Sequence, residues 1–326
     1  MLLTKKNILA LSLFIMMTIL AACGGQDESS SENETNTSEN SEETTQEATE
    51  LTLTDAMGHE VTVPANPEKV LASYLEDYLV ALDVTPVAQW SVQNGIQDYL
   101  QEYLKDVPTI DSTLPLEAVT SFTPDLIIMD SASQVEGTAY DQYSKIAPTY
   151  VVGESNNNDW REELLTVGEV LNKKDKAQEA LDEYEQKAEA AKEEIQAAVG
   201  SESAAAIWLV NNSFFVVGET VSSGAVLYGD LGLTTPNVVK EISSTATGNW
   251  SPISLEKLAE LDADHLFLIN SDKANGSEML KDPLWQNIPA VKNNQVYEFE
   301  SNTSWLYSGP IANSQIIDDV LESLVK

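Results

Sequence analysis

The side chains that could do chemistry in this 326-residue chain are few, and they indicate binding rather than catalysis. There are two histidines, His59 and His265, and a single cysteine, Cys23. A site for a bare divalent metal usually draws on several His, Cys or carboxylate ligands, which two separated histidines cannot supply. The chain also has no glycine-rich phosphate loop and no Gly-x-Ser-x-Gly motif. We therefore expect no enzyme activity, no cofactor and no metal held directly by the protein.

Aromatic and polar residues that follow predicted strands are the candidates for ligand contact. In open α/β sheets, ligands bind just past the carboxyl ends of the strands. Rings in such loops suit a bulky ligand, and the hydroxyl and amide groups beside them can donate hydrogen bonds to it. The predicted ligand contacts are Tyr74, Trp90, Ser131, Gln134, Thr220, Ser222, Ser223, Trp250, Trp305 and Tyr307.

Core packing is the competing interpretation for every tryptophan. Trp160, Trp208 and Trp285 are flanked by apolar or helical residues, so for these three core packing is favoured. The tryptophans in the predicted contact set lie in polar stretches instead, and there ligand contact is favoured.

Two series of alternating strands and helices must position these residues. The first has a hairpin over 51–63 and strand segments at 69–73, 85–90, 126–129 and 149–152. The second has strand segments at 204–210, 213–218, 265–269 and 295–299, and ends in a helix over 311–324. Apolar strands that alternate with helices are typical of parallel sheets covered on both faces. The pattern predicts two doubly wound α/β lobes.

One long helix separates the two series. Residues 175–199 carry apolar or small side chains in alternating steps of four and three, without Gly or Pro, and Gly200 follows them. At 1.5 Å per residue this segment spans roughly 38 Å. A surface helix of one domain or a short coiled-coil arm would show the same periodicity. We divide the folded chain into an N-terminal lobe, 51–172, the helical segment, 173–200, and a C-terminal lobe, 201–326.

An internal similarity relates the two lobes. Leu116 and Asp125 match Leu255 and Asp264 at an offset of 139 residues, and an apolar strand follows each aspartate. Segments of this kind converge easily, but their placement on either side of one long helix suggests two similar lobes.

The N-terminus has the pattern of an exported lipoprotein. Residues 1–22 contain Lys5 and Lys6, an apolar run too short to span a membrane, and small residues that end at Cys23. This arrangement resembles the bacterial lipoprotein signal, which implies cleavage before Cys23, a diacylglyceryl thioether on its sulfur and an acylated amino terminus. The following residues, to position 50, are rich in Ser, Thr, Asn and Glu and predict a disordered acidic tether.

The charge of the chain limits its partners. It has 53 Asp and Glu against 17 Lys and Arg, a net charge of −36. Nucleic acid and anionic lipid headgroups are therefore excluded as partners. Arg161 is the only arginine, so a strongly anionic ligand would find few bases.

Several segments together carry a family resemblance that runs from about residue 51 to the end. PANPEKVLASYLEDYLVALDVTPVAQW, PLEAVTSFTPDLIIM, YSKIAPTYVV, NWSPISLEKLAELDADHLFLI and DPLWQNIPAVKNNQVYEF resemble the iron-siderophore substrate-binding lipoproteins of Gram-positive ABC importers. The resemblance implies two Rossmann-like α/β lobes joined by a single rigid helix, the class III type of periplasmic binding protein. It implies a monomer, lipid-anchored on the extracellular face of the cell membrane, that delivers a ferric siderophore to an ABC permease and its ATPase.

The resemblance also implies residue roles. In the family an acidic residue on each lobe meets arginines of the permease, and Glu117 and Glu256 occupy the matching positions. Stabilisation of a helix N-terminus by a first-turn acid is the competing role for both residues.

The loop at 219–223 lacks the arginine or basic cluster that some members carry, so a ferric catecholate with a charge near −3 is disfavoured. The expected ligand is a ferric hydroxamate or citrate-hydroxamate. Cobalamin or haem binding by the same fold, and a surface adhesion or sensor module, remain the alternatives.

Overall fold

The computed structural model describes residues 50–93, 95–155 and 158–325. The predicted signal segment, Cys23 and the tether up to residue 49 lie outside these residues. Within the described ranges, no helix combines the length and apolar character needed to cross a bilayer.

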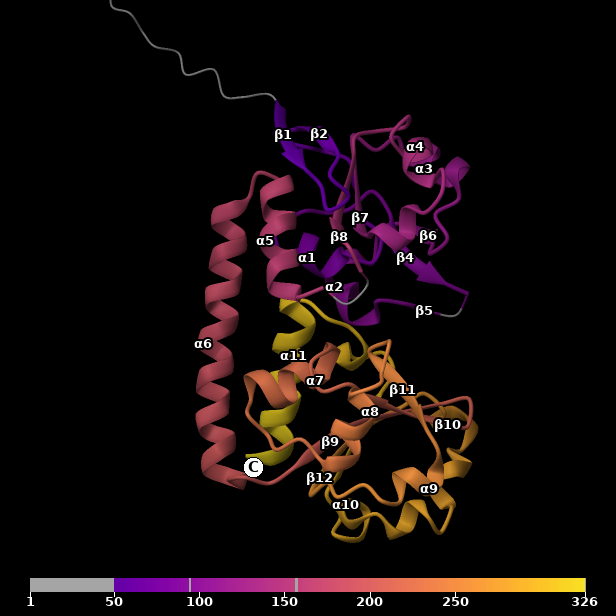
Figure 1. Cartoon of the computed structure of the whole chain (residues 1–326), viewed down its shortest axis with the longest axis vertical. Coiled ribbons are helices and arrows are strands. Elements are labelled where there is room, and N and C mark those ends of the chain that lie inside the picture. Colours follow the sequence, from indigo (N-terminus) through magenta and orange to yellow (C-terminus); the bar gives the residue numbers. More distant parts are fainter. Residues whose placement is uncertain (1–49, 94, 156–157, 326) are drawn as a thin grey trace, which may run out of the picture. The chain divides into compact units, whose positions relative to one another are not determined.

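The N-terminal lobe is built on two small sheets whose strands are mainly parallel, with a hairpin at one end (Figure 1). The hairpin pairs β1 with β2, and two three-stranded sheets have the orders β3-β7-β8 and β5-β4-β6. Its strands are β1 Glu50–Thr54, β2 Glu60–Pro64, β3 Val70–Leu71, β4 Gln89–Val92, β5 Gly95–Ile96, β6 Thr109–Asp111, β7 Leu126–Ser131 and β8 Thr149–Gly153. Its helices are α1 Glu76–Ala81, α2 Gln101–Leu104, α3 Leu116–Phe122, α4 Ala139–Tyr143 and α5 Trp160–Val170.

The C-terminal lobe is a mixed five-stranded sheet of order β11-β10-β9-β12-β13. Strands β9, β12 and β13 are parallel, whereas β10 and β11 extend the sheet antiparallel. The strands are β9 Ala204–Val210, β10 Ser213–Val217, β11 Trp250–Ile253, β12 His265–Asn270 and β13 Val296–Glu300. The helices are α7 Ser222–Gly224 with its π-helical continuation Ala225–Asp230, α8 Asn237–Ser243, α9 Leu255–Leu258, α10 Pro289–Lys292 and α11 Pro310–Leu324.

Most predicted elements recur in order and type, but one strand is shifted, and the short elements β5, β6, β11, α4 and α8 were not predicted. The strand expected at 85–90 lies at 89–92, because Pro86 removes a donor that a sheet interior would need. Strand β11 was not predicted because its sequence contains Pro252 among polar residues, which argues against a strand. The structure places β11 at the edge of the sheet, where a proline is tolerated.

Helix α6, Lys174–Val199, is the predicted long helix and is the only covalent connection between the lobes (Figure 1). Its buried stripe comprises Ala177, Tyr184, Ala188, Ala191 and Ile195, which recur at helical spacing. The helix contacts α5 of the N-terminal lobe and α11 of the C-terminal lobe. The interpretation as a connector is therefore confirmed, and a free coiled-coil arm is excluded.

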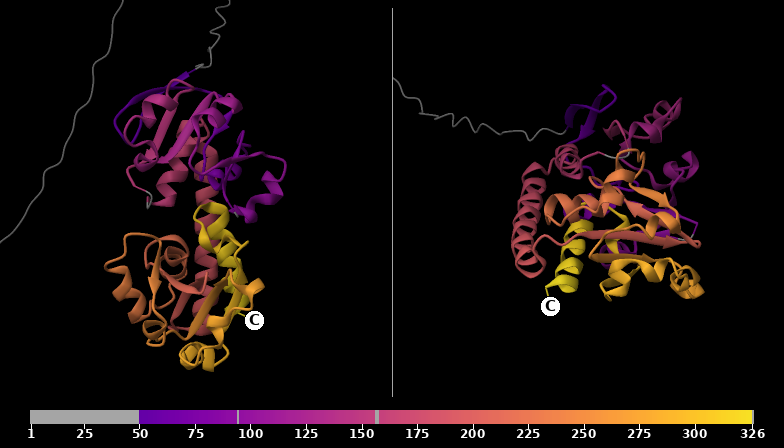
Figure 2. Two further views of the ribbon diagram at one scale, coloured as in Figure 1. Left: turned by 90° about the vertical axis from the view of Figure 1, so that its right-hand side faces the viewer. Right: turned by 60° about the horizontal axis from the view of Figure 1, so that its bottom comes forward.

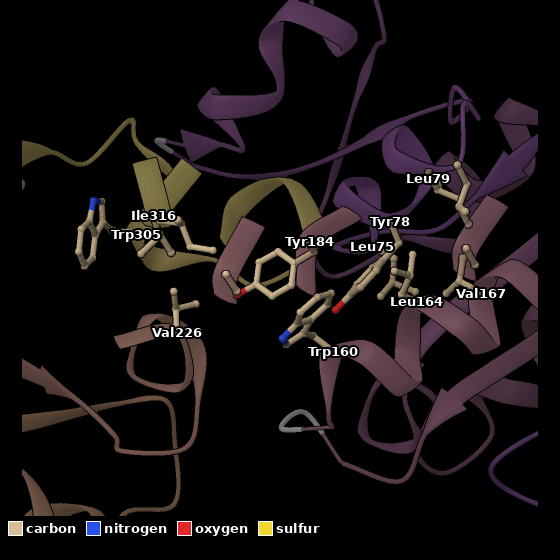
Figure 3. Packing of buried hydrophobic residues seen from close by; sticks show 14 of the residues in the cluster. Leu75, Tyr78, Leu79, Trp160, Leu164, Val167, Tyr184, Val226, Trp305 and Ile316 are labelled. Atoms are coloured by element: carbon tan, nitrogen blue, oxygen red, sulfur yellow. The ribbon is translucent and has the colours of Figure 1, made fainter. Parts of the chain in front are cut away.

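One hydrophobic core passes through both lobes along these helices. It includes Leu79 and Leu164 of the N-terminal lobe, Tyr184 of α6, and Phe267 and Ile316 of the C-terminal lobe. Figure 3 shows part of this row of side chains, from Leu79 past Tyr184 to Trp305. Because interiors are packed as densely as organic crystals, a shared core opposes large changes in the angle between the lobes.

The two aspartates of the internal repeat, Asp125 and Asp264, make equivalent backbone contacts in the two lobes. Asp125 accepts hydrogen bonds from the backbone N–H groups of Glu68 and Lys69, at 2.8 and 3.0 Å, just before β3. Asp264 accepts from the backbone N–H of Ser203, at 2.8 Å, just before β9. Each aspartate thus connects β7 or β12, the middle one of three parallel strands in its lobe, to the strand beside it.

A buried carboxylate joins α11 to the N-terminal lobe. Asp77 of α1 is 1% exposed, and its oxygens accept from the N–H groups of Ile311 and Ala312, both at 2.9 Å. The Tyr99 hydroxyl donates to the same carboxylate at 2.9 Å. Gly309, with φ of 138°, lies so close that a Cβ there would be 2.4 Å from an Asp77 oxygen. Helix α11, which runs beside α6 in the views of Figure 2, is therefore a second brace between the lobes.

Glu76, the residue before Asp77, is fully buried. One of its carboxyl oxygens accepts from the Trp90 backbone N–H, and the other has no partner among the described residues. Burial raises the pKa of Glu76 from its ordinary value near 4.5 to about 8, although backbone hydrogen bonds partly oppose the shift. This carboxyl is therefore mainly neutral at physiological pH.

We expect Asp77→Ala to lower the free energy of unfolding by about 1–3 kcal/mol, because two N–H groups of α11 lose their acceptor in a buried place. Asp77→Asn keeps one acceptor oxygen and should lose less. Urea denaturation measures both, with the exposed Asp141→Asn as the control. An Asp77→Ala midpoint equal to that of the native chain would contradict the bracing role.

We expect the stability of the native chain to fall as pH rises from about 5 to 8.5, in part because folded Glu76 binds its proton more tightly than unfolded Glu76 does. Glu76→Gln keeps the shape and removes the titration, so its melting temperature should fall less over this range. Thermal melts at several pH values test this, with the exposed Glu102→Gln as the control. Parallel profiles for the native chain and Glu76→Gln would contradict the expectation.

Candidate functional site

A cavity of about 270 Å³ opens between the two lobes. The N-terminal lobe contributes residues from the start of α1, the end of β7 and the start of α5. The C-terminal lobe contributes Thr220, Val221 and Ser222 before and within α7, Asn249 before β11, and Leu306 to Ser308 before α11. These are mostly segments past the carboxyl ends of strands, where ligands bind in open α/β sheets.

An aromatic cluster forms one wall and crosses between the lobes. Tyr74 lies in the left-handed region, with φ of 72°, and is 40% exposed. Its ring centroid is 6.3 Å from that of Tyr307 and 5.2 Å from that of Trp90. The Tyr307 hydroxyl donates to the backbone carbonyl of Ile96 at 3.2 Å, and its ring lies 5.1 Å from that of Tyr99. Tyr74 and Tyr307 line the cavity, whereas Trp90 supports Tyr74 from behind.

A second group of aromatic rings, which the sequence placed in the core, also reaches the cavity. Trp160 and Tyr78 line it while belonging to the shared core (Figure 3). Trp160 is 6% exposed and packs edge-on against Tyr184 at 4.7 Å, and its indole N–H has no partner among the described residues. Core packing was therefore the right interpretation for Trp160, but it omitted the unpaired donor at the edge of the cavity.

Acidic groups dominate the electrostatics of the cavity. Asp130 and Glu163 are 9% and 8% exposed, and their carboxyl groups are close enough to share a hydrogen bond. Burial, together with the charge of Glu163, raises the pKa of Asp130 to about 7. Arg161 also lines the cavity, but its guanidinium already binds Glu185 and, at 2.8 Å, Asp230. No lysine lines the described part of the cavity, so its wall offers an anionic ligand no uncommitted cation.

Ser131 and Gln134 were predicted to contact ligand, and the structure places both behind the cavity wall. Ser131 is fully buried and its hydroxyl lies 2.9 Å from that of Ser133. Gln134 accepts from the backbone N–H of Asp130 at 3.0 Å. Asp130 itself lines the cavity, because successive side chains of a strand point to opposite faces.

Two of the three predicted residues in the loop after β10 line the cavity. Thr220 is exposed and lines the cavity beside Ser222, which is 7% exposed and has φ of 48°. The Ser222 hydroxyl donates to the Tyr307 carbonyl at 3.4 Å. Ser223 is fully buried, does not line the cavity, and its hydroxyl has no partner among the described residues.

Two predicted tryptophans lie away from the cavity. Trp305 is fully buried in the shared core, with its ring 4.9 Å from that of Phe267 and its indole N–H donating to Asp319 at 2.8 Å. Trp250 lies on edge strand β11, with its ring 6.1 Å from that of Trp208. Its neighbour Asn249 lines the cavity in its place.

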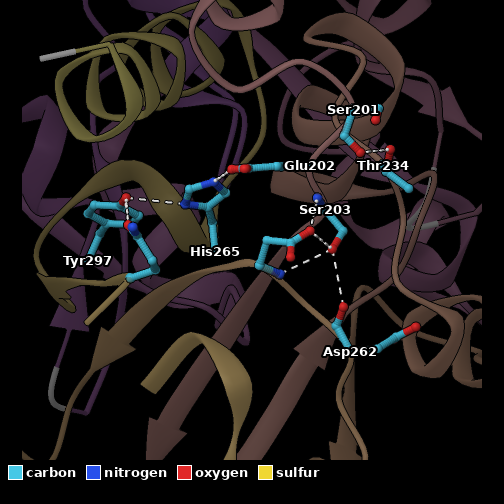
Figure 4. A network of polar contacts seen from close by, with 9 residues as sticks. Ser201, Glu202, Ser203, Thr234, Asp262, His265 and Tyr297 are labelled. Carbon is cyan, nitrogen blue, oxygen red and sulfur yellow. Dashed lines mark hydrogen bonds and ion pairs between the residues drawn. The ribbon is translucent and has the colours of Figure 1, made fainter. Parts of the chain in front are cut away.

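Neither histidine lies in the cavity. His265 is 4% exposed and is held between Glu202, at 2.6 Å, and the Tyr297 hydroxyl, at 3.2 Å (Figure 4). His59 pairs with Asp55 at 3.0 Å and stacks on Tyr140. Over the described ranges, no group of three or more His, Cys, Asp or Glu side chains could hold a metal ion.

The two predicted docking acids occupy equivalent places. Glu117 is in the first turn of α3 and Glu256 is in the first turn of α9, and both are exposed. Each helix leads into the middle one of three parallel strands in its lobe, β7 or β12. The structure therefore places one exposed acid at the same position of each lobe.

Sequence reasoning missed several cavity residues, namely Tyr78, Gln97, Asp130, Asn158, Trp160, Glu163 and Asn249. Most of them belong to helices, to a strand end or to the shared core. At such positions the sequence alone indicates core packing and gives no sign of ligand contact. Asp130 and Asn249 could have been found, because each is adjacent to a predicted residue, Ser131 or Trp250. Successive side chains of a strand point to opposite faces, so only one of two neighbours can face the cavity.

Comparisons with known proteins agree with this architecture. A sequence profile of the family described as periplasmic binding protein matches residues 71–303. The chain is 25% identical to the iron(3+)-hydroxamate-binding protein YxeB of Bacillus subtilis, over 99% of this chain and 98% of that protein. It is 29% identical to the probable siderophore-binding lipoprotein YfiY of the same organism, over 97% of each.

A solved structure extends the likeness to the fold. The FhuD protein from S. pseudintermedius superposes with a TM-score of 0.72 at 22% identity, over 85% of this chain and 99% of that chain. With its two α/β lobes, its single connecting helix and the match over residues 71–303, the chain belongs to the periplasmic binding protein family.

Proposed function

We propose that the chain is a membrane-anchored extracellular receptor that binds a ferric siderophore and delivers it to an ABC permease for iron uptake. The observation that carries the proposal is the inter-lobe cavity, whose tyrosines can rest on the face of a bulky chelate. The relatives named for hydroxamate and siderophore binding match nearly the whole chain, which supports the same ligand class here. The iron is cargo, held by the siderophore and not by protein ligands.

The charge of the cavity favours ferric hydroxamates or citrate-hydroxamates over catecholates. A ferric tris-catecholate carries a charge near −3 and would need paired cations in the cavity. The one arginine that lines it is bound by Glu185 and Asp230, while Asp130 and Glu163 add negative charge. Haem normally asks for an axial His, Tyr or Met. Neither histidine lines the cavity, so only its tyrosines would suit this alternative ligand.

The anchor and the docking surface complete the proposal. Cleavage before Cys23 and acylation of that residue would hold the lobes at the membrane through the acidic tether of residues 24–50. Glu117 and Glu256, one on each lobe, would meet basic residues of the permease while the ATPase drives transport. The receptor would act as a monomer, since each lobe presents its own docking acid.

Tryptophan fluorescence titration tests the ligand class. We expect quenching by ferrioxamine B and by a ferric citrate-hydroxamate, and none by a ferric tris-catecholate at the same concentration. Tyr74→Ala should weaken hydroxamate binding by roughly tenfold, because an exposed ring of the cavity wall is lost. Tyr103→Ala, exposed on α2 and outside the cavity, is the matched control. The absence of fluorescence quenching by all three chelates would refute the proposal.

Iron uptake tests the docking role. Glu117→Ala combined with Glu256→Ala should leave chelate affinity unchanged and reduce uptake of ⁵⁵Fe-siderophore by roughly tenfold or more in cells that carry the partner permease. The pair Glu102→Ala and Glu189→Ala, exposed acids elsewhere, controls for net charge. Full uptake by the Glu117/Glu256 double variant would leave only helix stabilisation as a role for these acids.

A further inference from the structure

The cavity contains a buried carboxyl pair to which the proposed function assigns no group of the ligand. Asp130 comes from the end of β7 and Glu163 from the first turn of α5, and about nine-tenths of each side chain is buried. Glu163 also accepts from the Tyr78 hydroxyl at 2.6 Å and from the Asn158 side-chain amide at 2.9 Å. These contacts hold the pair rigidly in the wall of the cavity.

Among the described residues that line the cavity, no uncommitted cation balances this pair. The Arg161 guanidinium lies over the Trp160 ring at 4.5 Å and is bound by Glu185 and Asp230. Asp159, a further acid of the cavity wall, accepts from the Arg161 backbone N–H and so caps α5. The cavity therefore carries a negative potential that a cationic group of a ligand would satisfy.

Two unpaired acceptors in the same wall indicate a ligand that donates hydrogen bonds. Gln97 is 3% exposed, and its side-chain oxygen has no partner among the described residues. The side-chain oxygen of Asn249, contributed by the other lobe, is also buried and unpaired there. Because a buried polar group without a partner is costly, both oxygens favour N–H or O–H groups of the bound molecule, and the unpaired Trp160 indole N–H favours one acceptor beside them.

We infer that the cavity selects ferric hydroxamates that carry a protonated amine, with the ammonium group held by Asp130 and Glu163. The inference rests on the proposed function and specifies its ligand. Three hydroxamate groups neutralise Fe³⁺, so the amine decides the charge of the whole chelate. An ammonium has three donors and no acceptor, which matches a wall of carboxyl and amide oxygens. A divalent metal is the weaker occupant, because the described residues offer no third ligand beside the pair.

A matched pair of ligands tests the inference on the unmodified protein. Ferrioxamine B carries a free amine, and its N-acetylated form keeps the same iron centre without that charge. We expect the native chain to bind the amine form roughly tenfold tighter than the acetylated form. Equal affinities for the two would overturn the inference and leave the proposed function intact, whereas binding of neither would overturn both.

Variants of the pair locate the effect. Asp130→Asn and Glu163→Gln keep the shape of the wall and should bring the two affinities together. Glu162→Gln, an exposed acid in the same turn of α5, should retain the preference for the amine. A preference that survives in both Asp130→Asn and Glu163→Gln would assign the amine to another place and overturn the inference.

The pH dependence gives an independent measurement. The charged or titratable groups that face Asp130 are Glu163, Asp159 and Arg161 from α5, Tyr74 and Tyr78 near α1, and Tyr307 from the other lobe. Since burial raises the pKa of Asp130 to about 7, lowering the pH from 8 to 6 protonates this carboxyl. Affinity for the amine form should fall over this range, while affinity for the acetylated form stays constant. Parallel pH profiles would count against the carboxyl pair.

Discussion

The carboxylate of Asp77 is the contact on which the arrangement of the two lobes depends. It belongs to α1 of the N-terminal lobe, and its two oxygens accept hydrogen bonds from the first backbone N–H groups of α11. A helix start is the one place in a helix where backbone donors are free, so a buried acid from another lobe can bind there without breaking any helical hydrogen bond. Gly309 is required beside it because no side chain fits in that space.

This contact and the shared core together determine the shape of the cavity. Tyr307 lies three residues before the start of α11 and Tyr74 two residues before the start of α1, so the helix contact brings the two rings to 6.3 Å. The core along α5, α6 and α11 keeps the lobes from separating. Binding by such a preformed cavity loses less conformational entropy than closure of two freely hinged lobes would. A modest adjustment of the lobes is what this architecture allows.

The two lobes are variations on one unit, and their differences bear on function. Strands β3, β7 and β8 correspond to β9, β12 and β13, and the aspartates before β7 and β12 make the same backbone contacts. The repeat explains why one exposed glutamate recurs at the same position of each lobe. The C-terminal lobe departs from the unit by adding antiparallel β10 and β11, and the loops at their ends carry Thr220, Ser222 and Asn249 to the cavity.

The sequence by itself determined what depends on local periodicity. The long helix, the main apolar strands and the internal repeat follow from side-chain spacing and were predicted correctly, whereas the short elements β5, β6, β11, α4 and α8 were not predicted. For the cavity wall, the prediction named the right segments but in two cases the residue next to the one that lines the cavity. Ser131 stands behind the wall while Asp130 lines it, and Asn249 lines it in place of Trp250. Tertiary structure alone decided these choices, because the face of a strand end that meets a ligand depends on how one lobe is set against the other. Tertiary structure also decided the burial of Trp305 and the pairing of Arg161 with acidic side chains, since both depend on residues distant in the chain.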